Sequence, residues 1–291
     1  MSQAIEFRHY TGCNGLTLAA DVGGDPSAPT VILLHGGGQT RHSWRGAMEK
    51  MLRRGYHVIN LDARGHGESA WAPDGEYGFT ALAGDLRAVI ATLSRPPALV
   101  GASMGGATSL YLVGTSPTPI AAALVLVDFV PRLDLEGARK IQTFMEAHPD
   151  GFATLEEAAD AVAAYNPHRP RSKDPSGLMK NLRLREDGRL YWHWDPRVIQ
   201  RRDKVEPPRV MEPLQEAAKN VKIPTLVVRG LQSDVVSESG IRALHEAIPH
   251  LEVFDVAGAG HMVAGDKNDA FNDGVLAFLQ RRFAAGDAPP P

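Results

Sequence analysis

A glycine-flanked serine between an apolar run and a helix-forming run constrains this chain more than any other feature. The segment is Gly-Ala-Ser-Met-Gly at 101–105; residues 97–100 before it are apolar, and residues 106–114 after it favour a helix. We expect a strand, a sharp turn and a helix, with Ser103 at the apex in a strained backbone conformation. Such a turn lifts the serine hydroxyl clear of the sheet edge, above the positive N-terminus of the helix.

Short apolar runs alternate with helical patterns along most of the remaining sequence. The runs predict strands at residues 16–22, 31–34, 57–61, 99–101, 121–127, 223–229 and 251–256. The helical patterns lie at residues 43–54, 79–93, 135–147, 155–165, 209–220, 238–247 and 269–283. This alternation predicts an α/β protein, with a mostly parallel sheet and helices on both of its faces.

Residues 129–220 break the alternation, because they separate two predicted strands and contain no clear buried strand. A loop of this length inside one domain must carry structure of its own. Its amphipathic helical pieces predict a helical lid, or cap, over the sheet edge, between core segments 1–128 and 221–283. The proline-rich tail at 284–291 is expected to be disordered.

The composition narrows the class of protein. The 291 residues are 43% hydrophobic and 22% charged, with a net charge of −3, which is typical of globular proteins and disfavours a nucleic-acid partner. The N-terminus does not read as a signal peptide, and no apolar run approaches the roughly 20 residues of a membrane span. The single cysteine, Cys13, leaves no intrachain disulfide framework and fits a reducing, cytoplasmic location.

A serine hydroxyl needs a base to take its proton, and a histidine base needs an acidic partner. His261 and Asp234 each follow a predicted strand, in the chain order serine, aspartate, histidine. The carboxyl ends of parallel strands meet at one edge, where ligands bind in open α/β sheets. We therefore predict a Ser103–Asp234–His261 triad. Asp128, at the end of the strand predicted at 121–127, is the alternative acid.

Ester chemistry also requires hydrogen-bond donors for the oxyanion that forms in the transition state. The segment His-Gly-Gly-Gly at 35–38 follows a predicted strand, and its glycines let a backbone N–H approach a substrate closely. Gly37 is the preferred first donor and Gly38 the alternative. The N–H of Met104, directly after the nucleophile, is the second donor. His35 is expected to orient this loop through hydrogen bonds.

Aromatic and histidine side chains supply the remaining candidates. Those expected to line a substrate pocket are His35, Trp44, Phe129, Trp192 and Trp194. His193, between the two tryptophans, is expected to face solvent. His66 and Asp62 are interpreted as structural turn residues, and neither a metal site nor a cofactor is predicted.

Taken together, these motifs resemble the α/β-hydrolase superfamily, in its capped branch of serine esterases and haloperoxidase-like and epoxide-hydrolase-like enzymes. The matching segments are 34–38, 62–69, 101–105, Asp234 and 260–261. The resemblance implies an eight-stranded sheet, a lid after the sixth strand, and hydrolysis of an ester or similar acyl bond without a cofactor. The epoxide hydrolases of this branch carry an aspartate where this chain has Ser103, which favours an acyl-enzyme over an alkyl-enzyme.

We interpret the chain as a carboxylesterase-type serine hydrolase acting on small or medium, largely apolar esters. Its partner would be a small-molecule substrate, with neither a membrane nor a nucleic acid involved, and a homodimer is left open. Four alternatives share the fold: a lactonase, a perhydrolase, a carbon–carbon bond hydrolase and a non-catalytic ligand receptor. The carbon–carbon bond hydrolase would need a carboxylate-binding arginine in the lid, for which the candidates are Arg132, Arg139 and Arg183.

Overall fold

The computed structural model describes residues 4–132, 134–165, 171–200, 207–260 and 268–284. Eight strands form one sheet in the order β1-β2-β4-β3-β5-β6-β9-β10. Their bounds are β1 (Ile5–Thr11), β2 (Thr17–Gly23), β3 (Thr30–Leu34), β4 (His57–Leu61), β5 (Ala98–Ala102), β6 (Ala123–Val127), β9 (Thr225–Gly230) and β10 (Glu252–Val256). Strand β2 pairs antiparallel with β1 and β4, and the other neighbours are parallel. The prediction of a mostly parallel eight-stranded sheet is confirmed.

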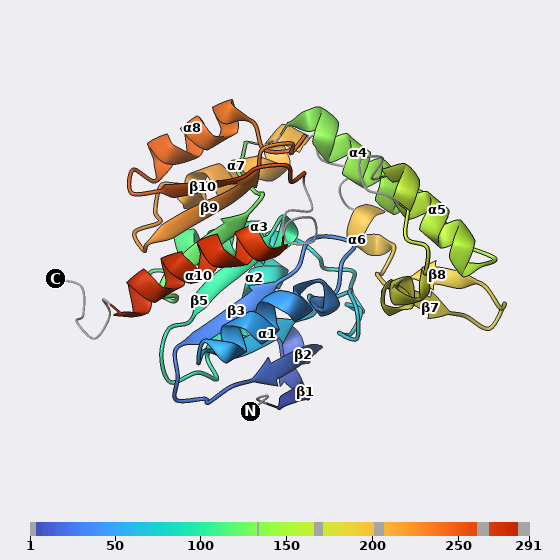
Figure 1. Cartoon of the computed structure of the whole chain (residues 1–291), viewed down its shortest axis with the longest axis horizontal. Coiled ribbons are helices and arrows are strands. Elements are labelled where there is room, and N and C mark those ends of the chain that lie inside the picture. The colour runs from blue at the N-terminus through green and yellow to red at the C-terminus, as the bar shows by residue number, and fades with distance from the viewer. Residues whose placement is uncertain (1–3, 133, 166–170, 201–206, 261–267, 285–291) are drawn as a thin grey trace.

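Helices cover both faces of this sheet (Figure 1). One face packs against α2 (Phe79–Ile90), α3 (Met104–Thr115), α7 (Pro207–Ala218) and α8 (Glu238–Ala247), and the other against α1 (Arg45–Arg53) and α10 (Asn268–Ala284). In β3, Ile32 and Leu34 belong to the first core, whereas Val31 and Leu33 belong to the second. Successive side chains of a strand point to opposite faces, and both faces are buried, so β3 is apolar from Val31 to Leu34.

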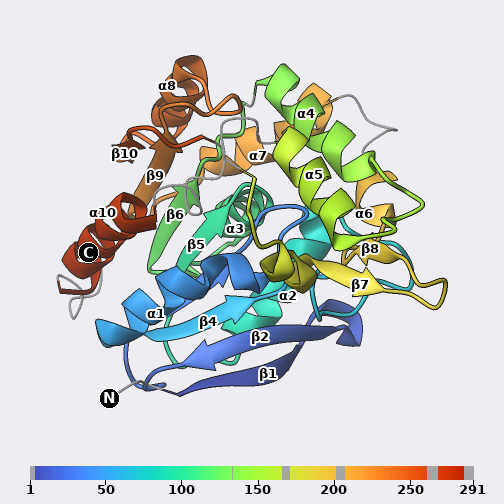
Figure 2. The same cartoon turned by 45° about the vertical axis from the view of Figure 1, so that its right-hand side comes forward.

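Most of the chain between β6 and β9 forms a separate layer beside the sheet. It contains α4 (Leu135–Glu146), α5 (Leu155–Tyr165), the 3-10 helix η3 (Ser176–Asn181), the hairpin strands β7 (Leu182–Leu184) and β8 (Leu190–Trp192), and α6 (Arg197–Gln200). These elements gather on the right of Figure 1, and Figure 2 brings them forward. We refer to them as the lid. From residue 285 the expected tail lies outside the described residues.

Two features of this region differ from the prediction. The hairpin β7–β8 was not expected, and α7, placed in the lid by the predicted boundary at residue 220, packs against α3. Leu214 of α7 is fully buried in the core of the sheet. Helix α7 therefore covers the sheet rather than the site.

Hydrogen bonds attach the hairpin end of the lid to the loop that follows β4. The Asp195 N–H donates to the Gly65 carbonyl at 2.9 Å, and the Tyr77 hydroxyl donates to Asp195 Oδ2 at 2.5 Å. Arg197 donates through Nη2 to the Ala72 carbonyl at 2.9 Å. The lid is thus fixed to the core at this end.

Candidate active site

Ser103 occupies a strained turn between β5 and α3. Its backbone has φ of 45° and ψ of −109°, a combination that L-residues adopt only under constraint from their surroundings. The flanking glycines permit the turn, because a Cβ on Gly101 would overlap Gly105 and a Cβ on Gly105 would overlap the Leu34 carbonyl. The strained apex predicted from the sequence is confirmed.

The glycine loop after β3 borders this serine. A Cβ on Gly36 would lie 3.4 Å from the Ser103 Cβ. Within the loop, the Gly36 N–H donates to Gln39 Oε1 at 3.1 Å, and the Gly38 N–H donates to His66 Nε2 at 3.3 Å. In the part of the chain that the structure describes, the Gly37 N–H has no hydrogen-bond acceptor.

Two buried histidines, His35 and His66, form hydrogen bonds with the backbone of the glycine loop. His35 Nε2 accepts the Ala63 N–H at 3.0 Å, so its Nδ1 carries the proton and donates to the Gly36 carbonyl at 2.8 Å. Burial lowers the pKa of His35, and the neutral ring persists at neutral pH. His66 contacts the Arg64 carbonyl through Nδ1 at 3.1 Å while its Nε2 accepts from the loop. The expected loop-orienting role of His35 is consistent with these bonds.

A third histidine reaches this group from the lid. The ring centroids of His35 and His66 are 5.2 Å apart, and those of His66 and His193 are 5.8 Å apart. His193 Nδ1 accepts the Gly67 N–H at 2.7 Å. Its side chain is buried, so the expectation that it faces solvent was wrong. Burial, together with the adjacent His66 and His35, lowers the pKa of His193 well below its usual value.

These two lowered pKa values predict that acid destabilises the fold. Below pH 6.5 the unfolded chain takes up protons that His35 and His193 in the folded chain do not, so the free energy of unfolding falls as pH decreases. Each histidine contributes a slope of up to about 1.4 kcal/mol per pH unit, from the unfolded-state pKa down to the folded one. We expect His193→Gln to have a shallower dependence than the parent in urea unfolding at pH 7.5, 6.5 and 5.5. Parallel curves would contradict this account, and His245→Gln, on the exposed face of α8, is the matched control.

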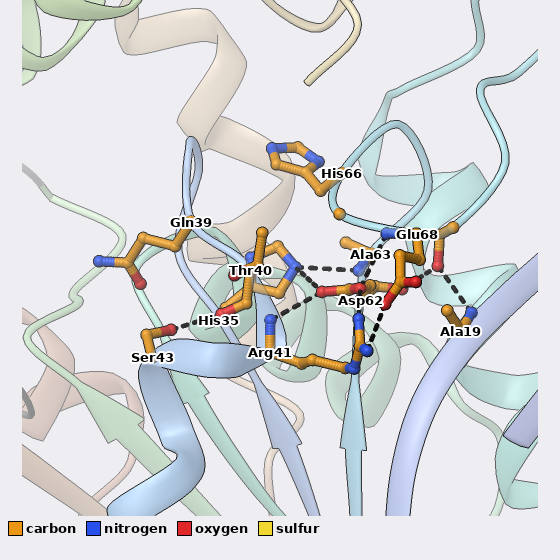
Figure 3. A network of polar contacts seen from close by, with 12 residues as sticks. Ala19, His35, Gln39, Thr40, Arg41, Ser43, Asp62, Ala63, His66 and Glu68 are labelled. Atoms are coloured by element: carbon orange, nitrogen blue, oxygen red, sulfur yellow. Dashed lines mark hydrogen bonds and ion pairs between the residues drawn. The ribbon is translucent and has the colours of Figure 1, made fainter. Parts of the chain in front are cut away.

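A buried carboxylate ties the glycine loop to the turn after β4 (Figure 3). Asp62 is fully buried; it accepts the Arg41 N–H at 2.7 Å through Oδ1 and pairs with Arg41 Nη1 at 2.5 Å through Oδ2. It also accepts the Glu68 N–H at 3.0 Å, and His35 Nε2 lies 3.9 Å from Oδ1. A paired and hydrogen-bonded buried charge is costly to disturb. These contacts agree with the structural role expected of Asp62.

The two candidate acids have different surroundings. Asp128 is 1% exposed, with φ of 46°, directly after β6. Its carboxylate accepts the Gly230 N–H at 3.2 Å and the Ser233 hydroxyl at 2.6 Å. The Asp234 side chain is 53% exposed, and Lys140 Nζ lies 3.2 Å from its Oδ2. The third predicted triad member, His261, lies outside the described residues.

The predicted pocket residues separate into two groups. Trp194 lies against the glycine loop, because a Cβ on Gly38 would be 3.4 Å from its ring; Trp192 stacks on Trp194 at a centroid distance of 5.0 Å. Trp44 ends the 3-10 helix η2 (Arg41–Trp44) and packs instead against Phe271, in the core between the sheet and helices α1 and α10. It therefore does not line the proposed pocket. Phe129 packs against the start of α3 within the opposite core.

Sequence reasoning missed two residues that shape the site. Met145 projects from α4 toward the loop, since its Sδ would lie 3.7 Å from a Cβ on Gly37. Gln39 accepts a hydrogen bond from the Gly36 N–H through its side-chain oxygen. The amphipathic pattern of residues 135–147 indicated that α4 buries one face, but gave no sign of what that face contacts.

The described part of the chain contains neither a cluster of potential metal ligands nor a candidate membrane-spanning helix. Among those residues no three histidine, cysteine or acidic side chains gather as a metal site would require. No described helix has the length and apolar character to cross a bilayer.

The fold and the strained serine turn define a class of enzymes in which a nucleophile sits between a strand and a helix. A profile of the alpha/beta hydrolase fold family matches residues 29–267, and the chain belongs to this family. It is 30% identical to esterase Rv0045c of Mycobacterium tuberculosis (strain ATCC 25618 / H37Rv), over 88% of this chain and 84% of the relative. It is 29% identical to the sn-1-specific diacylglycerol lipase ABHD11 of Mus musculus, over 88% and 82%.

A solved structure shows the same architecture. E-2-(acetamidomethylene)succinate hydrolase superimposes with a TM-score of 0.83, covering 95% of this chain and all of that one (100%), at 24% identity. That likeness concerns the fold alone. The relatives at higher identity are an esterase and a lipase, both of which are hydrolases.

Proposed function

We propose that this protein is a serine carboxylesterase that cleaves small or medium, largely apolar esters through an acyl-enzyme. The observation that carries this proposal is the positive φ of Ser103, directly beside a glycine loop. The strained backbone at the apex of this turn destabilises the fold, and its retention is explained if the turn serves to expose a nucleophile. The esterase and lipase named above support the reaction class.

In the proposed mechanism His261 takes the proton of Ser103 as its Oγ attacks the ester carbonyl. An aspartate orients the imidazole and stabilises the imidazolium. The tetrahedral oxyanion accepts hydrogen bonds from the N–H groups of Gly37 and Met104. His261 then protonates the departing alcohol, and later activates the water that releases the acid.

Gly37 is the better first donor because of how its neighbours are engaged. The Gly36 and Gly38 N–H groups donate to Gln39 and His66. These two bonds fix the loop on both sides of Gly37. A preorganised donor costs no reorganisation during the reaction, and each such donor contributes about 3–4 kcal/mol to the transition state.

The test of the proposed function is steady-state hydrolysis of p-nitrophenyl esters from acetate to palmitate. We expect the highest kcat/KM at short or medium acyl chains, because the lid side chains Met145 and Trp194 lie against the glycine loop and should limit the length of an acyl group bound there. Absence of turnover with every ester would overturn the esterase proposal. γ- and δ-lactones and peracid formation, run in parallel, separate the lactonase and perhydrolase alternatives.

Met145 should set the preferred chain length. Met145→Ala removes the lid side chain nearest to Gly37, and a poorly filled pocket binds a short acyl group less well. We expect kcat/KM for the acetate ester to fall about tenfold, and the optimum to move to longer chains. The same ester series measures both effects.

Met179→Ala is the matched control for this change. Met179 lies in η3 and is 44% exposed, so its removal should leave the chain-length profile unchanged. An unchanged profile in Met145→Ala would show that Met145 does not border the acyl pocket.

A further inference from the structure

We propose that Asp128, and not Asp234, is the aspartate that orients the base histidine of this site. The inference rests on the proposed ester hydrolysis and names the residue that the mechanism above leaves unassigned. Asp128 acts through the histidine, so it is a positioning residue.

The backbone places Asp128 beside the nucleophile. Strands β5 and β6 are parallel neighbours in which Ala102 lies opposite Val127, so the next residue of each strand is Ser103 and Asp128. The Ser103 N–H donates to the Val127 carbonyl at 3.1 Å. Both residues have positive φ, 45° and 46°, and strained backbone of this kind concentrates at functional sites.

The carboxylate of Asp128 is held in one orientation. Oδ1 accepts the Gly230 N–H and Oδ2 accepts the Ser233 hydroxyl, both from the end of β9 and the loop that follows. Each carboxylate oxygen has two lone pairs, so a further N–H donor fits beside these two bonds. A buried carboxylate with a fixed orientation is suited to fixing the tautomer of an imidazole.

The chain just before the histidine meets the same residue that anchors Asp128. A Cβ on Gly230 would lie 2.5 Å from the Gly260 carbonyl oxygen, and the Gln232 N–H donates to the Ala259 carbonyl at 2.9 Å. Gly230 therefore contacts both the Asp128 carboxylate and the backbone that leads into residue 261. The backbone of residues 259–260 and the Asp128 carboxylate thus meet at the same end of β9.

Asp234 has contacts of another kind. Its carboxylate is 53% exposed and pairs with Lys140 of α4. Its backbone carbonyl lies against Gly137 of the same helix, where a Cβ would overlap it. A charge in contact with water is screened by the solvent, and these contacts of Asp234 anchor α4 to the loop after β9.

The test compares Asp128→Asn with Asp234→Asn on the p-nitrophenyl ester that the parent hydrolyses best. Asparagine tolerates positive φ as aspartate does, so the backbone of residue 128 is retained. We measure kcat, KM and the pH profile of kcat/KM from pH 5 to 10, with thermal unfolding to confirm the fold.

We expect Asp128→Asn to lower kcat about 10³- to 10⁴-fold with KM changed less than about threefold. The acid limb of its kcat/KM profile should move to lower pH, because a neutral side chain no longer stabilises the imidazolium. Asp234→Asn should keep kcat within about threefold and retain the parent profile.

Collapse of kcat in Asp234→Asn, with the acid limb displaced, would overturn the proposal, and this variant decides the matter even if Asp128→Asn fails to fold. Loss of kcat in Asp128→Asn without a shift of the acid limb would also overturn it, since a purely structural defect gives that result. Failure of the proposed function has a different signature: the parent itself would hydrolyse no ester.

Discussion

Replacing Ser103 with alanine should abolish ester turnover while leaving the fold intact. The substitution removes only the hydroxyl group, and without it the histidine has no nucleophile to activate. Loss of a serine nucleophile lowers kcat by roughly 10⁶-fold in a well-studied serine protease, and only the weak catalysis supplied by the oxyanion donors and substrate binding should remain. The measurement is kcat for the best p-nitrophenyl ester, with thermal unfolding recorded for the same sample.

Ser116→Ala is the matched control for this substitution. Ser116 directly follows α3, the helix that Ser103 precedes, and accepts a hydrogen bond from Arg87 at 3.0 Å. We expect it to keep kcat within about twofold, as befits a surface change. Turnover within tenfold of the parent in Ser103→Ala would exclude Ser103 as the nucleophile.

Removing Asp85 should cause a large loss of stability. Asp85 binds Arg64 bidentately, at 2.6 Å to Nε and 2.7 Å to Nη2, and the two side chains are 4% and 3% exposed. It also accepts the Cys13 N–H at 2.8 Å. Asp85→Ala leaves a buried guanidinium without its carboxylate, which costs about 3–5 kcal/mol. Urea unfolding at pH 7.5 measures the change directly.

A surface pair gives the contrast that this prediction needs. Arg45 and Glu49 pair across one turn of α1 at 3.0 Å, with side chains 58% and 43% exposed. Glu49→Ala should cost about 0.5 kcal/mol or less, because solvent screens the pair. If Asp85→Ala and Glu49→Ala lower the free energy of unfolding by similar amounts, burial does not determine the cost of breaking these ion pairs.

The sheet was predictable because burial on both faces leaves a plain pattern in the sequence. Predicted strand 57–61 coincides with β4, and the other predicted strands differ by only a few residues from those observed. Strand β1 was missed, since most of its side chains are exposed at the sheet edge and carry no apolar run. Hairpin β7–β8 was missed because three-residue strands are too short to show a period.

The residues nearest the nucleophile could be predicted, because each of them comes directly after the end of a strand in the sequence. The glycine loop beside Ser103 is such a case. The contact between His193 and Gly67 joins residues 126 apart in the chain, and local pattern contains no information about such a pairing. The same limit applies to Asp128 and Asp234: both follow strands, and only the fold distinguishes a buried carboxylate from an exposed one.

Covalent labelling identifies directly whether Ser103 is the nucleophile. The protein is incubated with an alkyl fluorophosphonate, and intact mass, residual ester hydrolysis and the labelled peptide are determined together. We expect one adduct per chain, on the peptide containing Ser103, appearing in step with the loss of hydrolysis and absent from Ser103→Ala. Full loss of hydrolysis with the adduct on another residue, or hydrolysis that persists after Ser103 is labelled, would contradict it.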